Sequence, residues 1–221
     1  MSQAGFRFFD PTRSAGIHRR RLPHWEQKGT CAFVTFRLLD SLPPTVVQAW
    51  NRKRRDWLVR KGLPEGLSMA EALENLGERD RRSFQRFASS RYEAAMDKGL
   101  GTCVLRDPQV RGLLVDSLVF GDGTDYLLGG YVIMPNHVHL LIQPMTRPLS
   151  EILSTVRTCS ARVINRHLGR RGQLWDSEPF DHLVRSPHHF LRYQQYIAMN
   201  PRRARLPPSD YTLWQRVASP S

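Results

Sequence analysis

Apolar residues alternate with polar ones, or run together, in four stretches of the chain that predict β-strands. Residues 31–38 alternate and are rich in β-branched and aromatic side chains, which is typical of a strand. The stretches 125–134 and 137–143 are separated by only two residues, and so short a link predicts a hairpin of adjacent antiparallel strands. Residues 180–184 form the fourth predicted strand.

Apolar residues spaced three or four positions apart predict helices between these strands. Asp107-Pro108 is a typical helix start, and the apolar stripe that follows supports a helix there. The predicted helices span residues 45–60, 79–98, 107–119, 149–168 and 187–200, and the last is expected to stop at Pro201.

The order strand, helices, two strands, helix, strand, helix predicts an α+β fold, in which one antiparallel sheet is covered by helices. Residues 1–23 are expected to form an irregular basic arm, with Arg19 and Arg20 near its end. Residues 24–206 are expected to form a single domain, and residues 207–221 a C-terminal tail.

The charge of the chain indicates an anionic partner. Lysine and arginine number 33 against 20 acidic residues, which gives a net charge of +13. Such an excess concentrates polyanions around a protein, and nucleic acid is the most common of them. The alternative is that the charge serves only solubility. A hydrophobic content of 40% is sufficient for a buried core.

The cysteines and the apolar stretches indicate a cytoplasmic protein. Cys31, Cys103 and Cys159 are odd in number and widely spaced, which fits neither a disulfide framework nor a zinc cluster. No apolar run approaches the about 18 residues of a membrane span. The N-terminal residues also lack the pattern of a secretion signal.

His137-Val138-His139 is the most informative triplet in the sequence. Side chains alternate along a strand, so both imidazoles project from one face while Val138 points to the other, into a core. Two imidazoles placed in this way can hold one metal ion, and manganese and zinc accept such ligands. Magnesium accepts them when phosphate oxygens complete its coordination. The alternative for so short a motif is a pair of histidines on a solvated strand face.

Three segments of the sequence resemble a known family when they are taken in order. Tyr131-Val-Ile-Met-Pro-Asn-His-Val-His-Leu-Leu-Ile142 resembles the histidine–hydrophobic–histidine (HUH) motif of the single-tyrosine transposases, and of their REP-associated branch in particular. Gln173-Leu-Trp-Asp-Ser-Glu-Pro-Phe-Asp-His-Leu-Val-Arg185 and Tyr196-Ile-Ala-Met-Asn-Pro-Arg-Arg-Ala204 resemble the two later blocks of that branch. The likeness spans most of residues 24–206, and residues 63–100 form a helical insertion within it.

The resemblance implies a ferredoxin-like antiparallel sheet with helices on its faces, and a metal-dependent nuclease and strand transferase that acts on DNA. It implies that His137, His139 and Asn200 bind Mg²⁺ or Mn²⁺ and that Tyr196 is the nucleophile. The intermediate would be a 5′-phosphotyrosine on single-stranded or hairpin DNA, with a free 3′ hydroxyl. It further implies a bacterial protein that associates with the nucleoid when it acts on DNA, either as a monomer or as a homodimer.

Helical spacing selects the same tyrosine. Residues four apart share one face of a helix, so Tyr196 and Asn200 project together. Tyr193 falls instead with Phe190 and Ile197 on the apolar stripe, where it is expected to be a core residue. A free phenol is mostly protonated at neutral pH, with a pKa of about 10, but it loses its proton more easily than a serine hydroxyl. The alternative for Asn200 is a residue that satisfies the end of the helix before Pro201.

Basic clusters are candidates for contacts with DNA phosphates. The candidate residues are Arg19, Arg20, Arg166, Arg170, Arg171, Arg192, Arg202 and Arg203. The alternative for each cluster is a solvated face.

Two other functions are compatible with these residues. One is a non-catalytic, domesticated relative that binds DNA hairpins. The other is a hydrolase in which the metal activates water, although no acidic cluster lies near the histidines in the sequence to support it. The stretch from 63 to 100 is longer than a minimal enzyme of this type needs, and the sequence assigns it no chemical role.

Overall fold

The structure is a computed structural model, and the following description applies to part of the chain. The described residues are 5–13, 16–19, 23–77, 79–81, 83–84, 87–88, 95–96, 98–177 and 179–217. In residues 16–19, 23–26 and 70 only the backbone is described.

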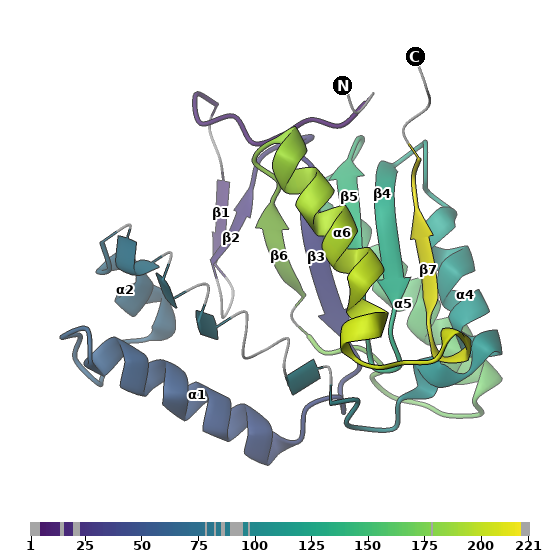
Figure 1. Ribbon diagram of the computed structural model, residues 1–221, viewed down its shortest axis with the longest axis horizontal. Coiled ribbons are helices and arrows are strands. Elements are labelled where there is room, and N and C mark those ends of the chain that lie inside the picture. The colour runs from purple at the N-terminus through teal and green to yellow at the C-terminus, as the bar shows by residue number, and fades with distance from the viewer. Residues whose placement is uncertain are drawn as a thin grey trace.

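One five-stranded antiparallel sheet forms the centre of the protein (Figure 1). Its strands, in spatial order, are β6 (Phe180–Leu183), β3 (Ala32–Arg37), β5 (His137–Pro144), β4 (Tyr126–Ile133) and β7 (Thr212–Gln215). The first four of these strands have the connections and the order of a ferredoxin-like βαββαβ unit. The predicted α+β fold and its four strands are therefore confirmed.

Helices cover both faces of this sheet (Figure 1). One face packs against α4 (Pro108–Val119) and α5 (Leu149–His167), and the other against α6 (Pro187–Arg203). Val138, Leu140 and Ile142 belong to the core beneath α4 and α5, whereas Leu141 belongs to the core beneath α6. The predicted alternation of β5 is therefore confirmed, and it places both histidines on the α6 side.

A smaller lobe lies beside the sheet (Figure 1). It contains α1 (Pro44–Val59) and α2 (Met69–Glu74), which share a separate cluster of buried apolar residues. Ser68 and Glu71 form a capping box that fixes the start of α2. The predicted helix at 79–98 lies partly outside the described residues, and the described part of it is helical at 79–81, 83–84, 87–88 and 95–96. None of the helices in the described part of the chain has both the length and the apolar character that a membrane crossing requires.

The described parts of the expected arm and tail contain regular structure that the sequence does not indicate. Within the expected irregular arm, β1 (Gly16–Arg19) pairs with β2 (Pro23–Glu26), and Phe6 packs against Phe190 of α6 with 4.7 Å between ring centroids. Within the expected tail, β7 pairs with β4 as the fifth strand of the sheet. The pairing of β1 shows that the prediction of an irregular arm is wrong for residues 16–19. The sequence did not indicate this strand because four residues are too few to show a periodic pattern.

The last helix does not stop at Pro201. α6 continues to Arg203, because a proline in the final turn removes only one backbone hydrogen bond. The next turn closes normally, since the Ala204 N–H donates to the Asn200 carbonyl at 3.0 Å. The extra turn keeps Arg203 on the same helix as Tyr196.

Gly129 of β4 lies directly beneath α6, and we expect its replacement by alanine to destabilise the fold by about 1–3 kcal/mol through overpacking. A Cβ atom there would lie 2.7 Å from Cζ of Phe190 and 3.1 Å from Cβ of Leu141. Gly112→Ala is the matched control, because Gly112 is exposed within α4 with open space around it. That change should stabilise the protein by about 0.5–1 kcal/mol. Urea unfolding measures both, and equal effects of the two variants would contradict the expected packing.

Candidate functional site

His137 and His139 lie on β5 beneath α6 and are almost completely buried. Their exposed fractions are 1% and 2%. The sheet register places Arg37 of β3 beside His137 and Thr35 beside His139. The alternative of two histidines on a solvated strand face is therefore wrong.

The two imidazoles converge on one point. Their Nε2 atoms are 3.1 Å apart, while each Nδ1 atom has a polar partner on the outer side. Nδ1 of His137 is 2.7 Å from Oδ1 of Asn136, and Nδ1 of His139 is 2.7 Å from the hydroxyl of Thr35. These outer contacts fix the ring orientations and direct both Nε2 atoms to the same position.

Burial keeps both rings neutral. It lowers the pKa of His137 to about 3. Burial also holds the pKa of His139 well below its ordinary value, with smaller contributions from His137 and Arg203. A neutral imidazole offers a lone pair to a metal ion. The two histidines therefore do not have to lose a proton at neutral pH before they bind a metal ion.

Tyr196 lies beside the histidine pair. Its ring meets His139 edge-on, with 5.2 Å between centroids, and also meets Phe33 edge-on at 5.6 Å. Tyr193 instead stacks flat on Phe33 at 4.2 Å. Both tyrosines are half-buried, so exposure does not separate them as the sequence indicates. They differ in orientation, because Tyr196 contacts the histidine pair and Tyr193 packs on a core aromatic ring.

Asn200 follows Tyr196 by one turn of α6 and is 1% exposed. Its Oδ1 atom is buried and has no hydrogen-bond partner among the described residues. A buried acceptor without a partner costs about 1–3 kcal/mol, so such an atom is a natural position for a ligand. The helix continues past Asn200, which removes the alternative that this side chain satisfies a helix end.

The donors at this site suit a divalent metal. Two nitrogen ligands at about 2.1 Å from one ion, at right angles to each other, are separated by about 3 Å, and the Nε2 atoms have this spacing. The unpaired amide oxygen of Asn200 is a third neutral donor. No group of three His, Cys, Asp or Glu residues that could hold a metal occurs in the described part of the chain.

Those predicted DNA-binding arginines whose side chains are described fall into three groups. Arg203 belongs to the site, because its guanidinium carbon lies 5.5 Å from the centre of the Tyr196 ring. Arg192 and Arg202 are exposed on the same helix. Arg166, Arg170 and Arg171 lie at the end of α5 and in the loop after it, on the helix that covers the other face of the sheet. The side chain of Arg19 and the whole of Arg20 lie outside the described residues.

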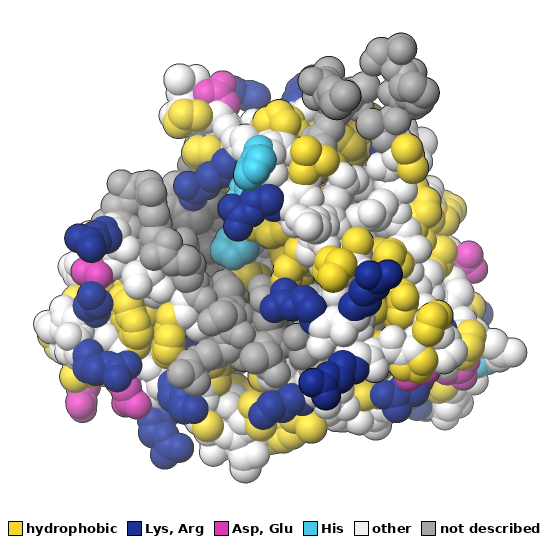
Figure 2. All heavy atoms as spheres, in the orientation of Figure 1, with side chains coloured by type: hydrophobic (Ala, Val, Ile, Leu, Met, Phe, Trp, Pro, Cys, Tyr) yellow, Lys and Arg dark blue, Asp and Glu magenta, His cyan; other side chains and the backbone are white. Residues whose placement is uncertain are grey.

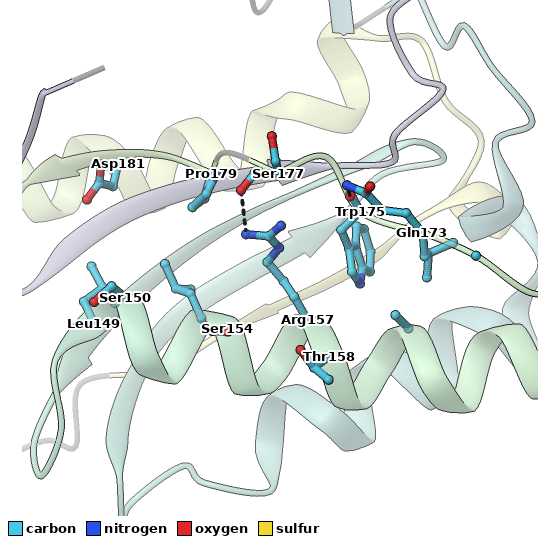
Figure 3. Close-up of a pocket in the computed structure, with 14 residues that line it drawn as sticks. Leu149, Ser150, Ser154, Arg157, Thr158, Gln173, Trp175, Ser177, Pro179 and Asp181 are labelled. Atoms are coloured by element: carbon cyan, nitrogen blue, oxygen red, sulfur yellow. Dashed lines mark hydrogen bonds between the residues drawn. The ribbon is translucent and has the colours of Figure 1, made fainter. Parts of the chain in front are cut away.

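A cavity of about 400 Å³ lies on that other face, between α5 and residues 172–181 (Figure 3). Arg157 crosses it and donates to the carbonyl of Ser177 at 3.3 Å. Asp181 lines the cavity, opposite Val34 in the sheet register, and so faces away from the histidine pair. Asp181 is therefore not in a position to orient either histidine.

Two residues of the site are missed by sequence reasoning. Thr35 is identified only by the register of β3 against β5, which a single sequence does not give. Asn136 is adjacent to His137, but its place in a short link indicates only a turn residue. Its side chain is nevertheless 1% exposed and contacts the ring of His137.

No protein-family model and no curated protein matches the chain. Among solved structures, it is similar to one described as a REP-associated tyrosine transposase bound to a REP hairpin. The two share 11% sequence identity over 93% of this chain and 94% of that chain, with a TM-score of 0.43. Likeness at this level does not define a shared fold or activity, so the fold and the site rest on the strand order and the side-chain geometry of this chain.

The buried histidines should make the protein labile to acid. The folded-state pKa of His137, about 3, lies below the unfolded value of about 6.5, so the unfolded chain takes up a proton that the folded protein does not. Stability should therefore fall as the pH drops below about 6.5, by about 2 kcal/mol at pH 5 from His137 alone. Burial lowers the pKa of His182 to about 4, which acts in the same direction.

Urea unfolding at pH 7 and pH 5, with a chelator present, measures this loss. His182→Gln should reduce the pH dependence. Equal stability of the parent protein at the two pH values would contradict the expectation.

Proposed function

We propose that this chain is a metal-dependent transposase that cuts and rejoins single-stranded DNA, with Tyr196 as the nucleophile. One observation carries the proposal. The ring of Tyr196 lies against His139, whose Nε2 atom converges with that of His137, and Asn200 adds a buried oxygen without a partner on the same helix. A potential nucleophile and a potential metal site are thus adjacent in a protein of net charge +13.

His137, His139 and Asn200 would hold Mg²⁺ or Mn²⁺. The ion would neutralise charge on the scissile phosphate and so lower the barrier to attack. The protein supplies the positioning, because Asn136 and Thr35 hold the outer nitrogens of the two rings. The buried rings also exclude water from that side of the site.

In the proposed reaction the phenol oxygen of Tyr196 attacks phosphorus. A new P–O bond joins the tyrosine to the 5′ phosphate of the downstream DNA, and the bond to the upstream 3′ oxygen breaks. The phenol proton is lost and the departing 3′ oxygen gains one. The phosphotyrosine bond is a phosphodiester like the one that was broken, so rejoining by a 3′ hydroxyl needs no ATP. The polarity of this cut is taken from the family resemblance.

Basic side chains near the tyrosine support the choice of substrate. The guanidinium of Arg203 lies over the Tyr196 ring, where it can contact a phosphate. Lys and Arg side chains are spread over the α6 face, whereas Asp and Glu lie near its periphery (Figure 2). The end of α5 and the loop after it lie on the opposite side of the sheet from Tyr196. Their arginines, Arg166, Arg170 and Arg171, would therefore contact DNA that flanks the cleavage site.

Covalent capture tests the proposal. Purified protein is incubated with single-stranded and hairpin DNA in Mg²⁺, in Mn²⁺ or in a chelator, and then separated under denaturing conditions. A 5′-phosphotyrosine retains the downstream DNA, so 3′-labelled DNA should shift to the protein band while 5′-labelled DNA is released as a shorter strand.

The other outcomes identify the other functions. DNA binding that is independent of metal, without cleavage, would favour the non-catalytic hairpin-binding protein. Cleaved DNA without an adduct would favour a hydrolase that uses water, and it would overturn the role of Tyr196.

A further inference from the structure

Asn136 occupies the short link between β4 and β5, where a polar residue is normally exposed. Here it is 1% exposed. The backbone of the link is held from two sides, because its carbonyls at Pro135 and Asn136 accept hydrogen bonds from the N–H groups of Leu105 at 3.2 Å and Leu38 at 2.9 Å. The side chain of Asn136 therefore points inward from a fixed backbone.

The amide nitrogen of Asn136 is committed to one direction. It donates to the carbonyl of Leu100 at 3.1 Å and to the carbonyl of Met96 at 3.4 Å. A carbonyl can only accept, so the NH₂ group must face these residues and Oδ1 must face His137. The amide cannot turn around without losing both hydrogen bonds.

The orientation of this amide determines which nitrogen of His137 carries the proton. Oδ1 can only accept, and it lies 2.7 Å from Nδ1, so Nδ1 must be the protonated nitrogen. In a neutral imidazole the other nitrogen then carries the lone pair. His139 is not constrained in this way, because the hydroxyl of Thr35 can either donate or accept.

We propose that Asn136 is a positioning residue that commits His137 to the tautomer with a free lone pair on Nε2, and that the backbone carbonyls of Met96 and Leu100 hold Asn136 in place. This gives the end of the 63–100 insertion a role in the site. The nature of the ion bound at Nε2 rests on the proposed function, whereas the tautomer does not.

Two substitutions separate the contact of Asn136 with His137 from its hydrogen bonds to Met96 and Leu100. Asn136→Ala removes both the donor and the acceptor. Asn136→Asp keeps an oxygen that accepts from Nδ1 of His137 but cannot donate to Met96 and Leu100. Asn165→Ala is the matched control, because the Asn165 side chain also donates to a backbone carbonyl, that of Gly172, at 2.8 Å.

Long-range ¹H–¹⁵N spectra of the full chain at pH 7, in a chelator and without DNA, report the tautomer directly. Nδ1 of His137 should be fully protonated in the parent protein, in Asn136→Asp and in Asn165→Ala, and only partly protonated in Asn136→Ala. Amide exchange around residues 96–100 should become faster in both Asn136 variants and remain unchanged in the control. An unchanged tautomer in Asn136→Ala, or its loss in Asn136→Asp, would overturn the proposal.

Titration of Mn²⁺ without DNA gives the second readout. Loss of a side chain that orients a metal-binding histidine typically weakens affinity about 10–100-fold, and we expect this for Asn136→Ala alone. If the parent protein binds no Mn²⁺, the metal part of the proposed function fails, and the tautomer measurement still decides the role of Asn136. If Asn136→Ala does not fold, the tautomer of Asn136→Asp decides it.

Discussion

Replacing Tyr196 with phenylalanine is expected to abolish the covalent protein–DNA adduct. The variant lacks only the phenol oxygen, so the ring should still contact His139, Phe33 and Arg203 as it does in the parent protein. Loss of a nucleophile lowers the rate of other enzymes by at least about a thousandfold, and Tyr193, the other tyrosine of α6, stacks on Phe33 instead. The adduct should therefore fall below detection with 3′-labelled DNA in Mg²⁺ or Mn²⁺.

Tyr193→Phe is the control for this change. It removes the same atom one turn earlier on the same helix, from a ring that stacks on Phe33. This variant should retain the adduct, and both variants should bind DNA as the parent protein does. An adduct that persists in Tyr196→Phe and disappears in Tyr193→Phe would reverse the assignment.

Replacing both His137 and His139 with glutamine is expected to eliminate Mn²⁺ binding and, with it, adduct formation. The double substitution removes the two nitrogens that converge at 3.1 Å and leaves only neutral amide oxygens, those of Asn200 and of the two introduced glutamines, as side-chain donors. Neutral amides are weak ligands compared with imidazole nitrogens, so the affinity should fall by more than about a hundredfold, and excess metal should not restore the reaction.

Calorimetry measures this loss, and covalent capture measures its consequence. His188→Gln is the control, because His188 is exposed at the start of α6. The double variant should remain folded, because glutamine is neutral and polar like the two buried histidines that it replaces. Adduct formation by the double variant, or by the parent protein in a chelator, would contradict the metal's role.

The fold and four residues of the candidate site, His137, His139, Tyr196 and Asn200, could be predicted because the periodic spacing of apolar and polar residues is strong in this sequence. The alternation along β5 places Val138 and Leu140 in one core and His137 and His139 on the opposite face, and this follows from strand geometry alone. Helical spacing likewise places Tyr196 and Asn200 together.

The remaining features depend on contacts between segments far apart in the chain. Thr35 reaches His139 through strand pairing over 104 residues, and Asn136 reaches Leu100 over 36. The positions of the basic residues also depend on the tertiary fold. Charge alone does not reveal that Arg203 adjoins Tyr196, whereas Arg166 lies on the helix that covers the other face of the sheet. The half-burial of Tyr196 is also a tertiary effect, since it arises from packing against β3 and β5.

The route of the chain around α6 limits how far the tyrosine can travel. Three residues separate α6 from β6, at one edge of the sheet, and eight residues separate α6 from β7, at the opposite edge. The helix is therefore connected at both ends to edge strands of the sheet, which restricts its outward movement. In the proposed reaction, the DNA ends would be exchanged at a tyrosine held in this way, so the rate of strand exchange should be governed by the motion of the DNA.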